Sequence, residues 1–346
     1  MVVAVVRRAP LSQLSRPLEP RVLRVPQVRA TLALLVSLAP VLGAAAAPAS
    51  AKQGPVLSNF TLAVPYGVLH PDASPRGADD FACKPTAAHP RPVVLVHGTF
   101  ANRFNSFAAL APALKRQGFC VFSLNYGAGQ LRGLGVYGMR SIRSSADQLA
   151  AFVDRVRTAT GAPQVDLVGY SQGAVVARAY LRWSGGANPA DPAANAVHAL
   201  VGLSGVNHGT KLFGLTDLMK GFGLTGLVRS QLGAGPLDLV VGSSLLRELN
   251  AGSETVPGVR YTMIATQTDE VSVPYRGAHL AAGPGAPGAA GAPGSVTNLV
   301  LQRGCPTDLS DHFNITYSPR AAALVVRALD PVSTMRVPCG IVLPFL

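Results

Sequence analysis

Residues 165–183, VDLVGYSQGAVVARAYLRW, decide how this chain folds. The stretch begins with a short, mostly apolar strand pattern at 165–168 and continues as a helical pattern at 172–183. Between them, Gly169-Tyr170-Ser171-Gln172-Gly173 matches the motif G-x-S-x-G, which in this setting is typical of a nucleophile elbow. The turn is so tight that the residues two places from the serine must be small, and the helix N-terminus directs partial positive charge at the hydroxyl. The sequence therefore predicts that Ser171 is a catalytic nucleophile.

Strand and helix patterns alternate on both sides of this stretch. We expect strands at 92–96, 119–124, 197–203, 260–266 and 296–301, and helices at 105–117, 143–159 and 318–329. The first of these strands is apolar throughout, as expected when a parallel sheet is buried on both faces. The alternation predicts an α/β fold, a mostly parallel central sheet with helices on both faces. Residues 52–90 are rich in Pro, His and Gly and are expected to be irregular.

Two segments interrupt the alternation. Residues 207–257 are rich in Gly and Leu and include an amphipathic piece at 213–227, so they are a candidate cap or lid over a site on the sheet. Residues 281–294, AAGPGAPGAAGAPG, form a low-complexity loop with nothing to pack.

The composition excludes several classes of protein. Of the 346 residues, 48% are apolar and 14% are charged, which excludes an intrinsically disordered chain. The 36 Gly and 28 Pro have no fixed period, so collagen is excluded, and the absence of a long repeat excludes solenoids and propellers. A single tryptophan and scattered Lys and Arg argue against a nucleic-acid groove. One α/β domain remains.

Residues 1–51 have the pattern of a secretory signal peptide. Six arginines precede the uncharged apolar run 31–43, and Ala49-Ser50-Ala51 is a small-x-small cleavage site. The run is broken by Pro40 and is shorter than the ~20 residues that span a bilayer, which disfavours a membrane anchor. We expect a secreted catalytic domain, 52–346, without a membrane span. Arg7-Arg8 leaves the twin-arginine export route open, and the long leader leaves the start codon open.

The mature chain stays basic. Removing six arginines and one glutamate with the leader lowers the net charge from +13 to +8. Codon bias and solubility explain this excess without a function, and attraction to an anionic cell wall or lipid surface is the alternative. We expect a monomer with no nucleic-acid partner.

Four cysteines, Cys83, Cys120, Cys305 and Cys339, predict disulfide bonds. Their number is even, the expected compartment is oxidising, and no C-x-x-C pair indicates a metal. Three pairings are possible. We favour Cys83–Cys120 and Cys305–Cys339 because each closes a local loop, and such loops contribute about 3 to 4 kcal/mol each on the chain-entropy model.

A serine hydroxyl needs a general base, and His312 is the candidate. It follows the last expected strand and precedes the last helix, so its imidazole can reach over the sheet edge to Ser171. The other six histidines are explained as structural or lie in irregular segments: His70, His89, His97, His198, His208 and His279.

The base needs a carboxylate to fix its tautomer, and Asp269 is the candidate. It follows the strand 260–266, and the order Ser…Asp…His is the one that α/β-hydrolases use. Glu270 is the nearest rival, but its side chain points away from that of Asp269 if the strand continues. Asp311 is too close to His312 in the chain and is expected to cap a turn.

The oxyanion of a tetrahedral intermediate needs two prearranged donors. We expect one to be the backbone N–H of Gln172, the residue after the nucleophile. The other is the N–H of Thr99, in the loop after the strand 92–96, with the Thr99 hydroxyl as a further candidate.

These motifs together resemble the secreted class 2 triacylglycerol lipases and esterases of the α/β-hydrolase superfamily, the actinobacterial ones in particular. The resemblance is carried, in family order, by VVLVHGTFAN (93–102), VDLVGYSQGA (165–174), GVNHGT (205–210), TQTDEVSVPY (266–275) and CPTDLSDHFNITYSP (305–319). It implies an α/β-hydrolase fold, the triad Ser171, Asp269 and His312, the oxyanion donors Thr99 and Gln172, and disulfides near both ends. The long leader, 207–257 and 281–294 depart from the family pattern.

The expected function is that of a secreted serine hydrolase that cleaves carboxylic esters of fatty acids, with no metal or cofactor. A short-chain esterase, a polyester depolymerase and an acyltransferase would use the same triad and remain alternatives. A binding module without activity is disfavoured because all three triad members are present. Apolar side chains of the candidate lid would line an acyl pocket, meet a lipid surface or pack in the core: Phe213, Leu215, Leu218, Phe222, Leu224 and Leu227.

Overall fold

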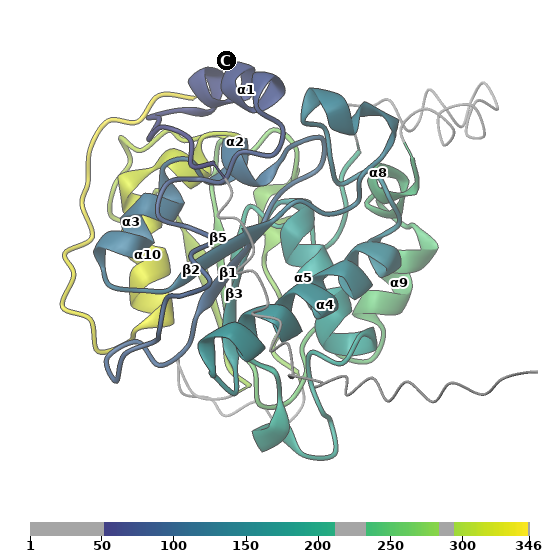
Figure 1. Cartoon of the computed structure of the whole chain (residues 1–346). Helices are drawn as coiled ribbons and strands as arrows, with labels where there is room; N and C mark the ends of the chain where they lie inside the picture. The colour runs from purple at the N-terminus through teal and green to yellow at the C-terminus, as the bar shows by residue number, and fades with distance from the viewer. Residues whose placement is uncertain (1–51, 212–232, 284–293, 345–346) are drawn as a thin grey trace, which may run out of the picture. The chain divides into compact units, whose positions relative to one another are not determined.

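Six parallel strands form the central sheet of the protein (Figure 1). Their order across the sheet is β2-β1-β3-β4-β5-β6. The strands are β1 (Val93–Val96), β2 (Val121–Leu124), β3 (Val165–Tyr170), β4 (Val197–Leu203), β5 (Arg260–Ala265) and β6 (Val296–Val300). Because all of them run in one direction, the loops that follow their carboxyl ends meet at one edge of the sheet.

This computed structural model describes residues 52–211, 233–283 and 294–344, all of which belong to the unit Ala49–Leu346. The expected leader (1–51), the amphipathic piece 213–227 with its apolar side chains, and most of the loop 281–294 lie outside the described residues. Within the described part of the chain, no helix combines the length and the apolar character needed to cross a membrane.

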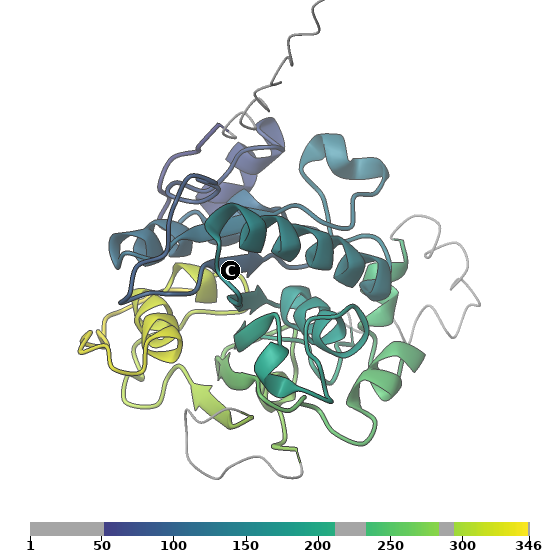
Figure 2. The same ribbon diagram turned by 60° about the horizontal axis from the view of Figure 1, so that its bottom comes forward.

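Helices cover both faces of the sheet (Figures 1 and 2). Those that pack on it are α4 (Ile142–Thr160) and α5 (Gln172–Trp183) on one face, and α3 (Leu110–Arg116) and α10 (Pro319–Leu329) on the other. The other α-helices of the described residues are α1 (Phe60–Leu69), α2 (Arg103–Phe107), α8 (Ala234–Asp238) and α9 (Ser244–Asn250). This arrangement confirms the predicted α/β architecture.

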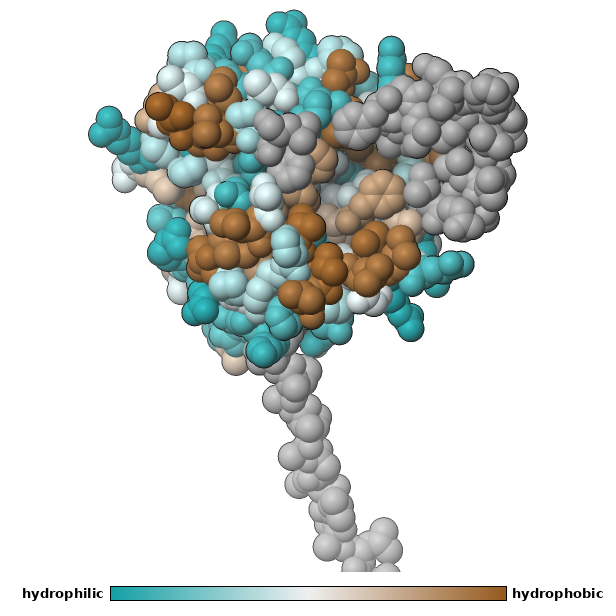
Figure 3. Space-filling model, turned by 90° about the horizontal axis from the view of Figure 1, so that it is seen from above, coloured by the Kyte–Doolittle hydropathy of each residue, from teal (hydrophilic) through white to brown (hydrophobic). Residues whose placement is uncertain are grey.

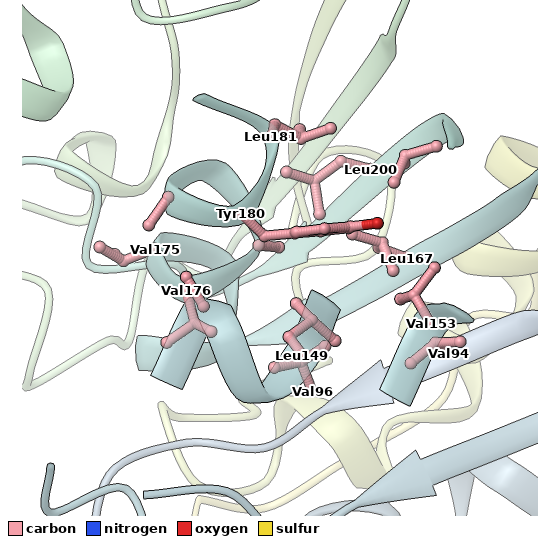
Figure 4. Packing of buried hydrophobic residues seen from close by; sticks show 14 of the residues in the cluster. Val94, Val96, Leu149, Val153, Leu167, Val175, Val176, Tyr180, Leu181 and Leu200 are labelled. Carbon is pink, nitrogen blue, oxygen red and sulfur yellow. The ribbon is translucent and has the colours of Figure 1, made fainter. Parts of the chain in front are cut away.

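The sheet has an apolar core on each side, which explains why β1 shows no alternation of apolar and polar residues. Val94 and Val96 belong to the core under α4 and α5, whereas Val93 and Leu95 belong to the core under α3 and α10. Figure 4 shows Val94 and Val96 among the α4 side chains Leu149 and Val153. Both faces of the strand are therefore buried.

The caps at the ends of α4 and α10 follow from local sequence. Ser141 accepts a hydrogen bond from the N–H of Ser144 at the start of α4, and Gly161 ends that helix with φ +76°, a conformation that favours glycine. Ser318 caps α10, and Pro319 occupies its first turn. The missing N–H of proline costs nothing there, because N–H groups of the first turn have no intrahelical partner.

The helix expected at 105–117 is wrong in one respect: two short helices, α2 and α3, occupy this region. Pro112 lies in the first turn of α3. In one continuous helix its ring would clash with the carbonyl of Ala108, and the chain breaks the helix at Ala108 and Ala109 instead.

The expectation that 52–90 is irregular is also wrong, because α1 lies in this segment. The Asn59 side chain caps α1 by accepting from the N–H of Leu62 at 2.9 Å. Its sequence, FTLAVPYGVL, is apolar or small on nearly every side, so it lacks the single apolar stripe by which a surface helix is found in a sequence.

Both favoured disulfides, Cys83–Cys120 and Cys305–Cys339, are present. The first ties the N-terminal segment to the residue before β2, and the second joins the loop after β6 to the C-terminal segment.

Candidate active site

Ser171 lies at the sharp turn between β3 and α5. Its backbone has φ +53° and ψ −120°, a strained conformation for a residue with a side chain, and its N–H donates to the Leu203 carbonyl at 2.9 Å. A Cβ atom on Gly173 would lie 1.9 Å from the Val96 carbonyl oxygen, and one on Gly169 would lie 2.6 Å from the Ala174 backbone. The two glycines are therefore required by the close approach of backbone on both sides of the turn.

A continuous hydrogen-bond chain joins the serine to two later loops. His312 Nε2 lies 2.8 Å from Ser171 Oγ, and His312 Nδ1 lies 2.9 Å and 3.1 Å from the two carboxylate oxygens of Asp269. All three residues are buried. Because a carboxylate only accepts, Nδ1 carries the proton and Nε2 is left to accept from the serine hydroxyl.

The loop after β5 holds Asp269 in place. Its Oδ1 accepts hydrogen bonds from the N–H groups of Val271 and Ser272, at 3.0 and 2.7 Å. Burial alone would raise the pKa of Asp269, but the charge and hydrogen bond of His312 and the Ser272 N–H lower it, and the net shift of the pKa is downward. Asp269 is therefore kept ionised.

Glu270 does not lie on a continuing strand, so the condition of the expectation for it is not met. Its side chain does not point away from that of Asp269, because β5 ends at Ala265 and the chain turns before reaching either residue. Glu270 Oε2 instead accepts a hydrogen bond of 3.1 Å from the backbone N–H of His312. Both carboxylates face the same histidine.

The loop that carries His312 is fixed by its own acidic residues. Asp311 Oδ1 accepts from the N–H of Asn314 at 2.9 Å, as expected of a turn cap, and Asp308 accepts from Ser310 and Ser318. Burial lowers the pKa of His312, but the negative charges of Asp269, Glu270 and Asp311 raise it, and the net shift of the pKa is upward.

The two expected oxyanion donors lie beside the serine. Gln172 is the first residue of α5, where a helix leaves its N–H groups without intrahelical partners. Thr99 follows β1 in a loop that lines the same pocket as Ser171. Among the described residues, none accepts a hydrogen bond from the N–H of either residue. The Thr99 hydroxyl, in contrast, donates to Gln172 Oε1 at 2.5 Å, so it is already engaged.

The Gln172 carboxamide links the loop of Thr99 to the segment that contains Gly138, since its Nε2 donates to the Gly138 carbonyl at 3.0 Å.

His97 supports the loop that contains Thr99. It is fully buried, its Nδ1 donates to the Gly98 carbonyl, its Nε2 accepts from the N–H of Tyr126, and burial lowers its pKa to about 4. A neutral His97 therefore shapes the loop, as the sequence predicts.

A mostly apolar pocket of about 100 Å³ opens at Ser171. The aromatic residues that line it come from four places in the chain: Phe60, Phe100, Tyr170 and Phe313. Phe60 belongs to α1, packs on Phe313 with ring centroids 5.2 Å apart, and donates its backbone N–H to Asn314 Oδ1. The sequence does not predict Phe60 as a pocket residue, because its pattern does not reveal α1.

Two of the remaining histidines bind groups other than Ser171. His198 Nδ1 contacts Asp166, at the opposite end of β3 from the serine, and His208 bridges Glu254 and the Gly277 carbonyl. In the described ranges, no three His, Cys, Asp or Glu side chains are grouped as a metal site requires.

The fold of the chain is similar to that of a solved fungal lipase. Lipase B of Aspergillus fumigatus is 19% identical with a TM-score of 0.52, and the match covers 74% of this chain and 55% of that protein. The mature lipase BlEst2 of Bacillus licheniformis is 16% identical with a TM-score of 0.47 over 71% of this chain and 94% of that one. This chain thus spans about half the length of the Aspergillus protein. At such identities the likeness concerns the fold alone, the α/β-hydrolase fold.

The sequence of the chain gives the family directly. None of the curated proteins compared with the chain matches it. The profile of the class 2 lipases matches residues 90–280, which include β1 to β5 and the turn that carries Ser171. Since this match spans more than half of the chain, the protein belongs to the class 2 lipases, a family of carboxylic ester hydrolases.

Proposed function

We propose that this class 2 lipase is a secreted serine hydrolase that cleaves carboxylic esters of fatty acids through an acyl-enzyme. The observation that carries the proposal is the buried hydrogen-bond chain from Asp269 through His312 to Ser171 at the strained turn after β3. Nucleophile, base and orienting carboxylate are within hydrogen-bond reach of one another, which is what covalent catalysis by a serine requires.

In the first half of the reaction, Ser171 Oγ attacks the ester carbonyl carbon while His312 Nε2 takes the hydroxyl proton. Asp269 stabilises the imidazolium that forms and keeps the ring in the productive tautomer. The N–H groups of Gln172 and Thr99 donate to the oxyanion. His312 then gives its proton to the leaving alkoxide, and the alcohol departs.

In the second half, water attacks the acyl carbonyl of the ester on Ser171. His312 removes a proton from the water and returns it to Ser171 Oγ, which leaves as the hydroxyl and releases the carboxylic acid. Each half uses the same base and the same oxyanion donors, so the chain's own residues account for every proton.

The surroundings of Ser171 support an apolar acyl substrate. Its pocket is lined mainly by aromatic and aliphatic side chains, with few polar groups. α1, which contributes Phe60 to the pocket, leaves Leu62 and Leu69 exposed at 53% and 75%, and Figure 3 shows apolar patches on this side of the molecule. These features favour a lipid or ester substrate presented at a lipid–water surface.

Three further parts of the proposal concern the whole chain. The leader 1–51 and the two disulfides support export to an oxidising compartment, with cleavage near Ala51. The segment 207–257, of which 207–211 and 233–257 are described, is proposed as a cap beside the pocket, because Thr210 and Leu239 line it. The mature protein is proposed to act as a monomer.

The test is the hydrolysis of p-nitrophenyl butyrate by the wild type and by Ser171→Ala. Removing the nucleophile of a serine hydrolase typically costs more than about 10⁴-fold in kcat, so the variant should be inactive in this assay. Ser58→Ala, which changes an exposed serine before α1, is the matched control and should keep full activity. Turnover by Ser171→Ala at the wild-type rate would overturn the proposal.

A further inference from the structure

Glu270 has no part in the mechanism above, yet its side chain reaches the histidine on which that mechanism depends. Its Oε2 lies 3.1 Å from the backbone nitrogen of His312, whereas Asp269 holds the ring of His312 at Nδ1. Two consecutive carboxylates of one loop therefore hold one histidine, the first at its ring and the second at its main chain.

The contact adds to a small set of hydrogen bonds between the loops after β5 and β6. The hydroxyl groups of Thr266 and Thr268 both donate to the Ser310 carbonyl, at 2.5 and 2.7 Å. These bonds fix the chain two residues before His312. The bond from Glu270 acts on His312 itself, so it sets the position of the Cα atom from which the imidazole extends.

The hydrogen bond alone does not account for a carboxylate at this position. An N–H group needs one acceptor, which an amide oxygen would supply equally well. Glu270 Oε1 is buried, and no described residue donates a hydrogen bond to it. Burying an unpartnered carboxylate oxygen costs free energy, and burial also raises the pKa of Glu270. What the carboxylate supplies beyond an amide is its negative charge beside His312.

We propose that Glu270 is a positioning residue for ester hydrolysis by this chain. Its hydrogen bond fixes the main chain of His312, and its negative charge stabilises the imidazolium that forms when His312 takes the serine proton. The inference rests on the proposed function, in which His312 is the general base.

The charged and titratable groups around His312 set the sign of the expected pH effect. They are Asp269 and Glu270 from the loop after β5, Asp311 from its own loop, and Tyr170 from the end of β3. His312 must be neutral to accept a proton, so kcat/KM rises with pH through the pKa of His312, which lies above its ordinary 6.5. Removing the charge of Glu270 lowers that pKa and moves the acidic limb to lower pH.

The experiment compares Glu270→Gln and Glu270→Ala with the wild type, using p-nitrophenyl butyrate from about pH 5 to 9. Gln keeps an acceptor and loses the charge, so its acidic limb should move down by roughly half to one pH unit with an unchanged KM. Ala loses both, so it should show the same shift and a kcat lowered by about tenfold. Glu248→Gln, which removes an exposed carboxylate paired with Arg143, is the control and should leave the profile unchanged.

An acidic limb that stays in place in Glu270→Gln, or that moves equally in Glu248→Gln, would overturn the inference. Thermal unfolding identifies a variant that fails to fold, and if Glu270→Ala fails, Glu270→Gln decides. An NMR titration of the His312 imidazole in the substrate-free protein gives the same pKa difference without activity. Activity that survives in Ser171→Ala would overturn the proposed function, while the NMR comparison would still test the role of Glu270.

Discussion

The pKa of His312, the hydrogen-bond partner of Asp269, is subject to two opposing effects. Burial disfavours the imidazolium, and the carboxylate 2.9 Å from Nδ1 favours it. The same carboxylate decides which nitrogen carries the proton, because it can only accept. In the proposed mechanism Asp269 therefore acts in two ways, through the tautomer of His312 in the resting protein and through the charge that His312 acquires during the reaction.

Asp269→Asn should lower kcat by about 10³- to 10⁴-fold with little change in KM. An amide nitrogen facing Nδ1 favours the tautomer with the proton on Nε2, which cannot accept from Ser171. Asp311→Asn is the comparison, since an amide oxygen still accepts from the N–H of Asn314, and it should cost less than about tenfold. The measurement is kcat and KM on p-nitrophenyl butyrate, and equal losses in the two variants would contradict the assignment of Asp269.

At the residue scale, functional groups can be predicted where their position in the chain is itself informative. Ser171 is fixed by its motif, and His312 by its place between the last strand and the last helix. The role of Glu270 could not be predicted, because it depends on where β5 ends. Beyond the end of β5 at Ala265, the alternation of strand side chains no longer gives the directions of Asp269 and Glu270, which the turn between them and the strand decides.

At the scale of elements, the strands follow their sequence patterns closely, because five of the six are buried along most of their length and therefore consist of short, mostly apolar runs. β4 lies at 197–203, as the sequence predicts, and α5 lies at 172–183. The sequence does not predict α1, because the exposed side of this helix is apolar as well as its buried side. A helix with apolar residues on its exposed side does not show the periodicity of an ordinary surface helix.

The exposed apolar side chains of α1 lead to a prediction about this helix. The double variant Leu62→Ser/Leu69→Ser should hydrolyse emulsified tributyrin several-fold more slowly and soluble p-nitrophenyl acetate at an unchanged rate, because only the emulsion presents a surface to which these side chains bind. Val332→Ser is the matched control, since Val332 is 87% exposed beyond α10. Wild-type rates that are equal below and above the solubility limit of tributyrin would argue against any interfacial role.

At the scale of the whole molecule, the parallel sheet gathers the site at one edge. Thr99 follows β1, Ser171 follows β3, and Asp269 follows β5. His312 comes after β6, the edge strand, so on its outer side its loop has no further strand against which to lie. The C-terminal segment packs against that loop instead, since the N–H of Leu309 donates to the Val342 carbonyl at 2.9 Å.

The disulfide Cys305–Cys339 closes this arrangement, because the 34 residues that it spans include both His312 and α10. Cys83–Cys120 closes a loop of similar length, 37 residues, far from His312 in the chain. Replacing either pair by alanine should lower the free energy of unfolding in urea by about 2 to 4 kcal/mol, since the entropy lost from the unfolded chain is similar. Stability alone therefore does not distinguish the two bonds.

Activity should distinguish them. Without Cys305–Cys339 the loop that carries His312 can open while the sheet stays folded, so ester hydrolysis should fail at a lower urea concentration than the global transition seen by circular dichroism. Without Cys83–Cys120 the two transitions should coincide, because that bond does not restrain the histidine. Coincident transitions in both variants would show that the loop and the sheet unfold as one unit, and that the C-terminal segment positions His312 without help from its disulfide.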